Sequence, residues 1–291
     1  MWQAYSLGSI VFNCLEDIAD KRAMTRAPGI DSNVATTIRV VLYCLLVIPI
    51  TALLGQTVSW YISPGIVAFG LASTLMSSAY TVVLKRVNVT TIAVLGYVAP
   101  LIFLIIDHAI GERVSLTQGL AVVGLVAGGI GFALDGKLSF DRPTILALGV
   151  MFIYSGAEFY YAKWMFKHEG LNVISLFTNV WGWAAAFLVA WLAVRRKLPL
   201  LLTKEVISYA KLSTLAKSFD VMTSIAWGVG ITMTTTAQFS AMAVFFPPTM
   251  LILALVAQMA FHVDLGERIE RQTIARKVSM VALLTISGVF V

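Results

Sequence analysis

Long apolar segments, separated by short polar or Gly- and Pro-containing stretches, recur along the whole chain. Each is about 20 residues long, the length that a helix needs to cross a hydrocarbon core of roughly 30 Å. None shows the alternating pattern of an outer-membrane strand, and a lipid-exposed backbone must satisfy its own hydrogen bonds. The pattern therefore predicts an all-α, polytopic integral membrane protein with ten transmembrane helices. We expect these helices at residues 2–23, 34–54, 63–84, 90–110, 116–134, 143–166, 172–194, 218–238, 241–262 and 273–291.

Composition supports this interpretation and excludes a water-soluble fold. The 291 residues are 59% apolar and 12% charged, against roughly 45–50% and about 25% in soluble domains. Met1 is not followed by a basic region or a small-residue cleavage site, so we expect a retained first helix rather than a signal peptide. Cys14 and Cys44 lie in apolar segments without metal-ligand spacing, which indicates packing residues. We expect no metal and no cofactor.

The net charge of +6 is distributed as in a membrane protein rather than a nucleic-acid-binding one. Of the 21 Lys and Arg residues, Arg113, Lys163 and Lys167 follow even-numbered helices, Arg39 lies within a helix, and the others follow odd-numbered helices. The positive-inside rule places the basic connections in the cytosol and both termini outside it. The longest connection, residues 195–217, is expected as a basic interfacial helix on anionic headgroups or as a disordered basic loop.

Three short matches recur in the same order in the two halves of the chain, which indicates a duplication. They are Glu16 with Lys21 against Glu158 with Lys163, Val67–Gly70 against Ile225–Gly228, and Gly111-Glu112-Arg113 against Gly266-Glu267-Arg268. We therefore predict a first five-helix repeat at residues 1–138 and a second at residues 139–291. Five is an odd number, so the second repeat enters the membrane in the opposite orientation. Such inverted repeats are typical of secondary transporters, with the binding site between the halves near mid-membrane.

Carboxylates within predicted spans are the first candidates for chemistry, because a charge there is costly unless it is protonated, paired or facing a polar cavity. Glu158 has Ala162 one turn later and so lacks a local base, whereas Asp17 has Lys21 four residues on and is expected to form a helical ion pair. A proton and a cation compete for one unpaired carboxylate, which is the basis of proton-coupled antiport. Glu158 and Glu16 are thus proton-coupling candidates. The alternative for both is interhelical hydrogen bonding or snorkelling at a helix end.

Aromatic side chains beside glycines are candidates for solute contact. Trp227 precedes Gly228 and Gly230, which allow close approach to the backbone, and its indole offers a face to cations and aromatic rings. Phe69 is its counterpart in the first half. Trp181, Asn179 and Tyr43 are further candidates, and packing explains each of these aromatic and polar residues equally well. Gly111, Glu112, Gly266 and Glu267 fall at loop-to-helix junctions, where capping and gating geometry explain them before chemistry does.

With these features, the chain resembles the drug/metabolite transporter superfamily in its ten-helix, EamA-like form. The segment Tyr80–Leu134 is the most similar stretch. Locally, Ala157-Glu158 and Trp227-Gly228-Val229-Gly230 resemble the small multidrug resistance exporters, in which protons and cationic drugs compete at a glutamate and a tryptophan precedes Gly-Val-Gly. The resemblance implies cytosolic termini, whereas the charge distribution predicts the reverse.

We therefore expect a secondary active transporter that exports or exchanges a small cationic or aromatic solute for protons by alternating access. It would reside in a lipid bilayer, most simply the bacterial inner membrane, bind no nucleic acid and be compatible with a functional monomer. One alternative is a proton-independent uniporter or exchanger of a neutral or anionic metabolite, with structural glutamates. A remote alternative is an intramembrane prenyltransferase-type enzyme, suggested by Glu16, Asp17 and Asp20, although no second acidic cluster is evident to hold magnesium.

Overall fold

The computed structural model describes residues 1–53, 55, 59–87, 141–233 and 242–261, with isolated positions within 116–124 and 275–286. Seven α-helices account for most of this part. They are α1 (Trp2–Arg26), α2 (Ser32–Leu53), α3 (Pro64–Arg86), α7 (Arg142–Glu169), α8 (Val173–Val194), α9 (Lys204–Thr232) and α11 (Phe246–Phe261), with the 3-10 helices η2 (Leu198–Leu202) and η3 (Met242–Phe245). The all-α prediction is confirmed there, and most boundaries agree within about a turn. The helices expected at 90–110, 116–134 and 273–291 lie largely outside the described residues.

The helices have the composition of membrane spans. Within the described part, α2, α3 and α8 are long and apolar enough to cross a bilayer. Large apolar side chains such as Leu45, Leu75 and Ile153 are exposed, as lipid-facing residues are. Polar caps start the later helices: Ser63 accepts a hydrogen bond from the Ile66 N–H at 3.2 Å, and Asn172 accepts one from the Ser175 N–H at 2.7 Å.

Residues 204–217 are helical, so of the two alternatives expected for residues 195–217 a helix, rather than a disordered loop, is found there. After the short η2, Thr203 caps α9, and the helix continues without a break to Thr232. Val206, Tyr209, Ser213 and Lys217 are buried, whereas Lys204 and Lys211 are exposed. These buried positions recur every three or four residues and so form one face of a helix. The exposed lysines obscured this face in the sequence pattern.

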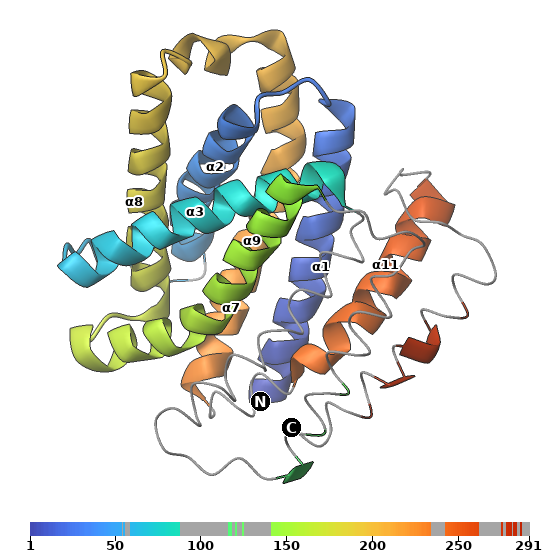
Figure 1. The fold of residues 1–291 in the computed structure, drawn as a ribbon. Coiled ribbons are helices and arrows are strands. Elements are labelled where there is room, and N and C mark those ends of the chain that lie inside the picture. The colour runs from blue at the N-terminus through green and yellow to red at the C-terminus, as the bar shows by residue number, and fades with distance from the viewer. Residues whose placement is uncertain are drawn as a thin grey trace.

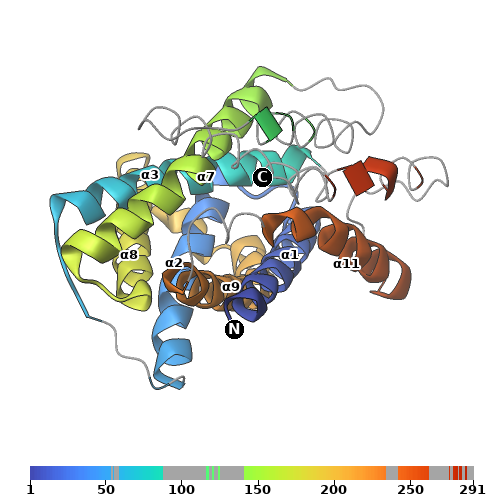
Figure 2. The same cartoon turned by 90° about the horizontal axis from the view of Figure 1, so that it is seen from below.

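The helices of the first part of the chain pack against those of the second. Helix α1 lies along α9, and α3 lies along α7 (Figure 1). Helix α2 contacts α8 and α9, and α3 also contacts α8. Seen from below, α1 lies between α9 and α11 (Figure 2), and buried Cys14 packs in the α1–α11 cluster. Exchanging α1, α2 and α3 with α7, α8 and α9 turns the α1–α9 contact into α3–α7, the α2–α9 contact into α3–α8 and the α2–α3 contact into α8–α9, as two equivalent halves would.

Two glycines allow neighbouring helices to approach α8 closely. A Cβ atom on Gly228 would lie 1.7 Å from Cγ1 of Val173, and one on Gly70 would lie 2.5 Å from Cβ of Trp183. Both distances are far below van der Waals contact. The aligned Phe69-Gly70 and Trp227-Gly228 dipeptides therefore both include a glycine that helix packing requires.

We predict that Gly228→Ala lowers the melting temperature of the purified protein, because the added methyl group overpacks the α8–α9 contact at a cost of about 1–3 kcal/mol. Val173→Ala removes the clashing atom and should recover much of this loss in the double variant. Gly182→Ala is the matched control, since nothing lies within 4 Å of its Cβ position. Strictly additive effects of Gly228→Ala and Val173→Ala would contradict the proposed contact.

Polar contacts tie the helices together at the end where α1 joins α2 and α8 leads to α9, the upper end in Figure 1. Lys197 Nζ lies 2.5 Å from Asp31 Oδ2, and Lys85 donates a hydrogen bond to the Ile30 carbonyl. Lys21 Nζ donates to the carbonyls of Leu84 and Val87 at 2.7 and 2.8 Å.

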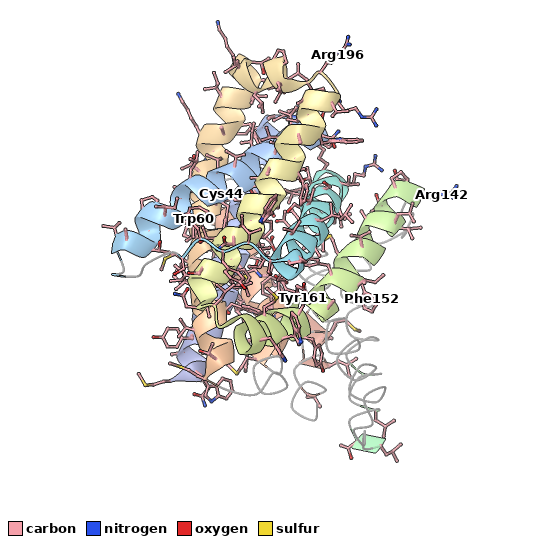
Figure 3. All side chains as sticks on the ribbon, turned by 90° about the vertical axis from the view of Figure 1, so that its left-hand side faces the viewer. Cys44, Trp60, Arg142, Phe152, Tyr161 and Arg196 are labelled. Atoms are coloured by element: carbon pink, nitrogen blue, oxygen red, sulfur yellow. The ribbon has the colours of Figure 1, made fainter. Side chains whose placement is uncertain are left out.

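Arg86 also pairs with Asp141 at the start of α7. In Figure 3, Arg142 and Arg196 lie in the upper part of the molecule, above Tyr161. Polar contacts therefore fasten the connections to the helix ends at this end of the molecule.

The Asp31 carboxyl lies outside the spans, and its pKa is lowered from the ordinary 3.8. Partial burial alone would raise this pKa, but the hydrogen bonds from Lys197 and from the N–H groups of Val34 and Asn33 outweigh it. A carboxylate with a lowered pKa in the folded state stabilises the fold above its ordinary pKa, and this stabilisation is lost as the pH falls through the lowered pKa.

We predict that Asp31→Asn lowers the melting temperature at about pH 7, by the 0–1 kcal/mol or so that such a partly exposed pair contributes. The difference from the wild type should shrink as the pH falls below about 4, because the wild-type carboxylate then becomes protonated. Thermal melts across this pH range test it, with Lys197→Met as the partner variant. A difference that persists unchanged at about pH 3 would rule the ion pair out as its cause.

Candidate functional site

Five charged side chains from three helices meet inside the bundle, and we call them the ion-pair network. They are Glu16 and Asp20 on α1, Arg39 on α2, and Lys217 and Asp220 on α9. Helical spacing explains the local arrangement, since Glu16 and Asp20 lie one turn apart, as do Lys217 and Asp220. The side chains of Asp20 and Lys217 are 0% and 3% exposed, and that of Asp220 is 18% exposed.

Arg39 binds the α1 side of the network. Its Nε and Nη2 atoms lie 2.9 and 2.7 Å from Asp20 Oδ2, and Nη2 lies 3.7 Å from Glu16 Oε1. Its Nη1 donates to Thr81 Oγ1 at 3.3 Å, and its Cζ lies 4.3 Å from the centre of the Tyr80 ring. Arg39 therefore connects α2 to both α1 and α3.

Lys217 binds three carboxylates at once. Its Nζ atom lies 2.7 Å from Asp220 Oδ2 and 3.4 Å from Asp20 Oδ2, and it donates a hydrogen bond to Glu16. Removing charges from water costs several kcal/mol per ion, so such a network is costly unless its geometry is good. Within it, three carboxylates face two bases.

Asp17 and Lys21 both bind α3. Asp17 accepts a hydrogen bond from the Tyr80 hydroxyl, and Lys21 binds the carbonyls at the end of α3. Asp17 and Lys21, which we expected to pair with each other within α1, thus both contact α3 or the residue that follows it.

Glu158, the counterpart of Glu16, has a different environment. It is half-buried on α7, and the Tyr154 hydroxyl is hydrogen-bonded to it and, at 2.7 Å, to Ser73 Oγ on α3. Among the described residues no Lys, Arg or His forms an ion pair with Glu158. Asp220, a like charge, lies within electrostatic range of Glu158. Glu158 is therefore the less compensated of the two candidate glutamates.

An aromatic cluster extends from Tyr154. The Phe69 ring lies 6.0 Å from the Tyr154 ring and 4.8 Å from the Tyr161 ring, and Trp227 packs edge-on against Phe177 at 5.3 Å. Phe69 belongs to one buried cluster formed by α3, α7 and α8, and Tyr154, Tyr161 and Trp227 of α9 pack against that cluster. The structure thus brings Phe69 and Trp227, two predicted solute contacts, into one region with the hydrogen-bond partner of Glu158.

Tyr43 and Trp181 form a second aromatic contact, between α2 and α8, with ring centres 5.4 Å apart. The Tyr43 hydroxyl is buried and has no hydrogen-bond partner within bonding distance in the described part of the chain. Trp181 also packs beside Val40 and Val47. This contact lies next to the α9 residue Val221, one position after Asp220.

Asn179 has a structural task. Its Oδ1 accepts from the Tyr61 N–H at 2.9 Å, and its Nδ2 donates to the carbonyls of Ser59 and Ser175 at 2.8 and 2.7 Å. Ser175 Oγ accepts from the Ser59 N–H at 2.8 Å. The amide that we expected at the solute is thus occupied in fastening residues 59–61 to α8.

Of the remaining glycines and glutamates predicted for the site, some lie within the residues that the structure describes and others do not. Gly228 and Gly230 are buried in α9, whereas Gly111, Glu112, Gly266 and Glu267 lie outside the described residues. In the described ranges no group of His, Cys, Asp or Glu side chains is arranged to hold a metal ion. Sequence reasoning did not assign Arg39, Lys217 or Asp220 to the site, although a lone arginine inside an apolar helix was a usable signal.

We predict that Lys217→Met strongly destabilises the protein, because it leaves buried carboxylates without their ammonium partner, at a cost of about 3–5 kcal/mol. Thermal melting measures the effect, and Lys211→Met on the exposed face of the same helix is the control. Adding Glu16→Gln to Lys217→Met should restore part of the loss. Equal melting temperatures for Lys217→Met and Lys211→Met would show that the network does not stabilise the fold.

Comparison with known proteins finds a match to a family model and a solved structure with a similar fold. The model of the EamA-like transporter family matches residues 8–134, which confirms the resemblance to the drug/metabolite transporter superfamily. A solved crystal structure described only as a protein is similar, with a TM-score of 0.68 at 12% identity over 98% of this chain and 96% of that one. At this identity the likeness concerns the fold alone. No curated protein matches the chain.

Proposed function

We propose that this chain, of which residues 8–134 match the EamA-like transporter family, is a membrane transporter of the drug/metabolite superfamily. In this proposal it exchanges protons for a small cationic or aromatic solute by alternating access. The observation that carries this proposal is Glu158, a half-buried carboxyl group that no base neutralises in the described part of the chain, beside Tyr154 and the Phe69 cluster. A carboxylate attracts a cation, and aromatic faces add cation–π attraction.

Competition supplies the coupling in this proposal. A solute cation and a proton each neutralise the same region, so binding of one favours release of the other. One pH unit supplies about 1.4 kcal/mol per proton, enough for roughly tenfold accumulation of a solute. One or two protons therefore suffice for export. Phe69 and Trp227 would line the solute, with Trp181 and Tyr43 on the α2–α8 side.

The proposed architecture is that of inverted repeats at residues 1–138 and 139–291. Its support is the reciprocal packing of α1 on α9 and of α3 on α7, which exchanging the halves preserves. These contacts join the halves, so a rocking motion along them would expose the region of Glu158 to one side and then the other. We place the basic connections in the cytosol and the protein, as a monomer, in the bacterial inner membrane.

The two glutamates take different parts in this proposal. Glu16 is bound by Lys217 and Arg39, so it acts within the ion-pair network rather than as a free ligand for solute. Glu158 is the direct contact. The same observation on Glu16 favours the second candidate, a proton-independent uniporter or exchanger of a neutral or anionic metabolite. The acidic residues that suggested a prenyltransferase-type enzyme are engaged with Arg39, Lys217 and Tyr80.

Proteoliposomes containing a trapped pH dye test the proposal. Organic cations, amines, amino acids and neutral metabolites are added to wild-type protein, to Glu158→Gln and to Glu205→Gln, an exposed control. We expect a cationic or aromatic solute to drive proton flux in the wild type and in Glu205→Gln. In Glu158→Gln the flux should fall at least about tenfold, because losing about 1.4 kcal/mol of attraction already changes affinity tenfold.

Two outcomes would contradict proton-coupled exchange. Solute movement without proton flux would favour the uniporter or exchanger. Normal flux in Glu158→Gln would make Glu158 structural.

A further inference from the structure

We propose that the ion-pair network takes up and releases the coupling proton, and that Asp220 is the residue at which this proton is exchanged. This inference rests on the proposed function and assigns solute binding and proton binding to two different sites. Glu158 binds the solute, and the network around Lys217 holds the proton. Nothing in the sequence pattern assigned a role to Asp220.

The first argument is charge balance. Glu16, Asp20 and Asp220 carry three negative charges when ionised, and Arg39 and Lys217 supply two positive charges. Asp17 and Lys21, the nearest further charges on α1, add one of each sign and leave the difference unchanged. An uncompensated buried charge is costly, and groups in this position neutralise instead. One bound proton makes the network neutral.

The second argument is an unpartnered atom inside the network. Asp20 Oδ2 forms ion pairs with Arg39 and Lys217. Asp20 Oδ1, in contrast, is buried and has no hydrogen-bond donor among the residues that the structure describes. A buried acceptor left without a donor costs about 1–3 kcal/mol. The donors that the described residues supply are therefore too few for the carboxylates buried here, which favours a network that holds one proton.

The third argument concerns access, which selects Asp220. Its side chain is 18% exposed, against 10% for Glu16 and 0% for Asp20. Asp220 is bound by Lys217, whereas Glu16 and Asp20 are each bound by both bases of the network. A proton thus reaches Asp220 without separating the Arg39–Asp20 pair.

The surroundings of Asp220 also explain how the two sites communicate. Glu16 on α1, Tyr43 on α2 and Glu158 on α7 lie within electrostatic range of it, and Lys217 is its partner on α9. A cation that binds at Glu158 favours the ionised form of Asp220 by the same attraction. The proton then leaves the Asp220 carboxyl group for the water on the side to which the site is open, so that solute binding and proton release are linked.

The test measures binding and proton release together in weakly buffered, detergent-purified protein. Benzyltrimethylammonium serves as the probe, because it is an aromatic cation that carries no exchangeable proton. Wild-type protein and the Glu205→Gln control should bind it and release protons. Asp220→Asn leaves two carboxylates facing two bases, so it should bind the probe and release none. Asp220→Glu should restore the release.

Glu158→Gln separates this inference from the proposed function. It should lose probe binding while keeping the exchangeable proton of the network. Proton release from Asp220→Asn at the wild-type level would overturn the inference and leave the proposed function intact. Loss of release in Asp220→Asn with normal binding to Glu158→Gln would instead overturn the assignment of the solute site and support the network.

Infrared difference spectroscopy between acidic and alkaline solutions gives a readout that needs no solute. The band of a protonated carboxyl group should appear in wild-type protein and in Glu158→Gln and be absent from Asp220→Asn. A band that survives in Asp220→Asn and disappears in Glu158→Gln would place the proton at Glu158 and refute the inference.

Discussion

The ammonium group of Lys217 fixes how three helices of this protein lie against one another. It is buried, and an ammonium ion in the protein interior is tolerated only where carboxylates surround it. Those carboxylates come from α1 and from the next turn of α9, and Asp20 in turn holds Arg39 of α2. Sliding α9 along α1 by one turn would separate these charges. The register of α9 on α1 is therefore set by electrostatics as well as by apolar packing.

The two halves share a packing pattern but differ in chemistry. Equivalent positions carry Glu16 and Glu158, yet the first is bound by two bases and the second by a tyrosine hydroxyl. Similar helix contacts in the two halves are thus combined with an unequal distribution of charged groups. Phe69 and Trp227, aligned in the two halves, in contrast pack beside one shared cluster.

The sequence was sufficient for features that depend on local pattern. Apolar length predicted the spans, and the glycines that follow Trp227 predicted close approach to the backbone. It failed where a residue's role depends on distant partners. Lys217 was assigned to a basic connection outside the spans because neighbouring exposed lysines concealed the buried face of α9, and its partner Glu16 lies 201 positions away in the chain. Asn179 was assigned to the solute because its task depends on the backbone of residues 59–61, which no side-chain pattern reveals.

The attachment of residues 59–61 to α8 has a mechanical consequence. This segment joins α2 to α3 and so belongs to the first half of the chain, but its backbone is hydrogen-bonded to Ser175 and Asn179 of the second half. The connector leads directly into the start of α3. These bonds therefore link the position of α8 to that of α3, so that a tilt of α8 would carry the start of α3 with it.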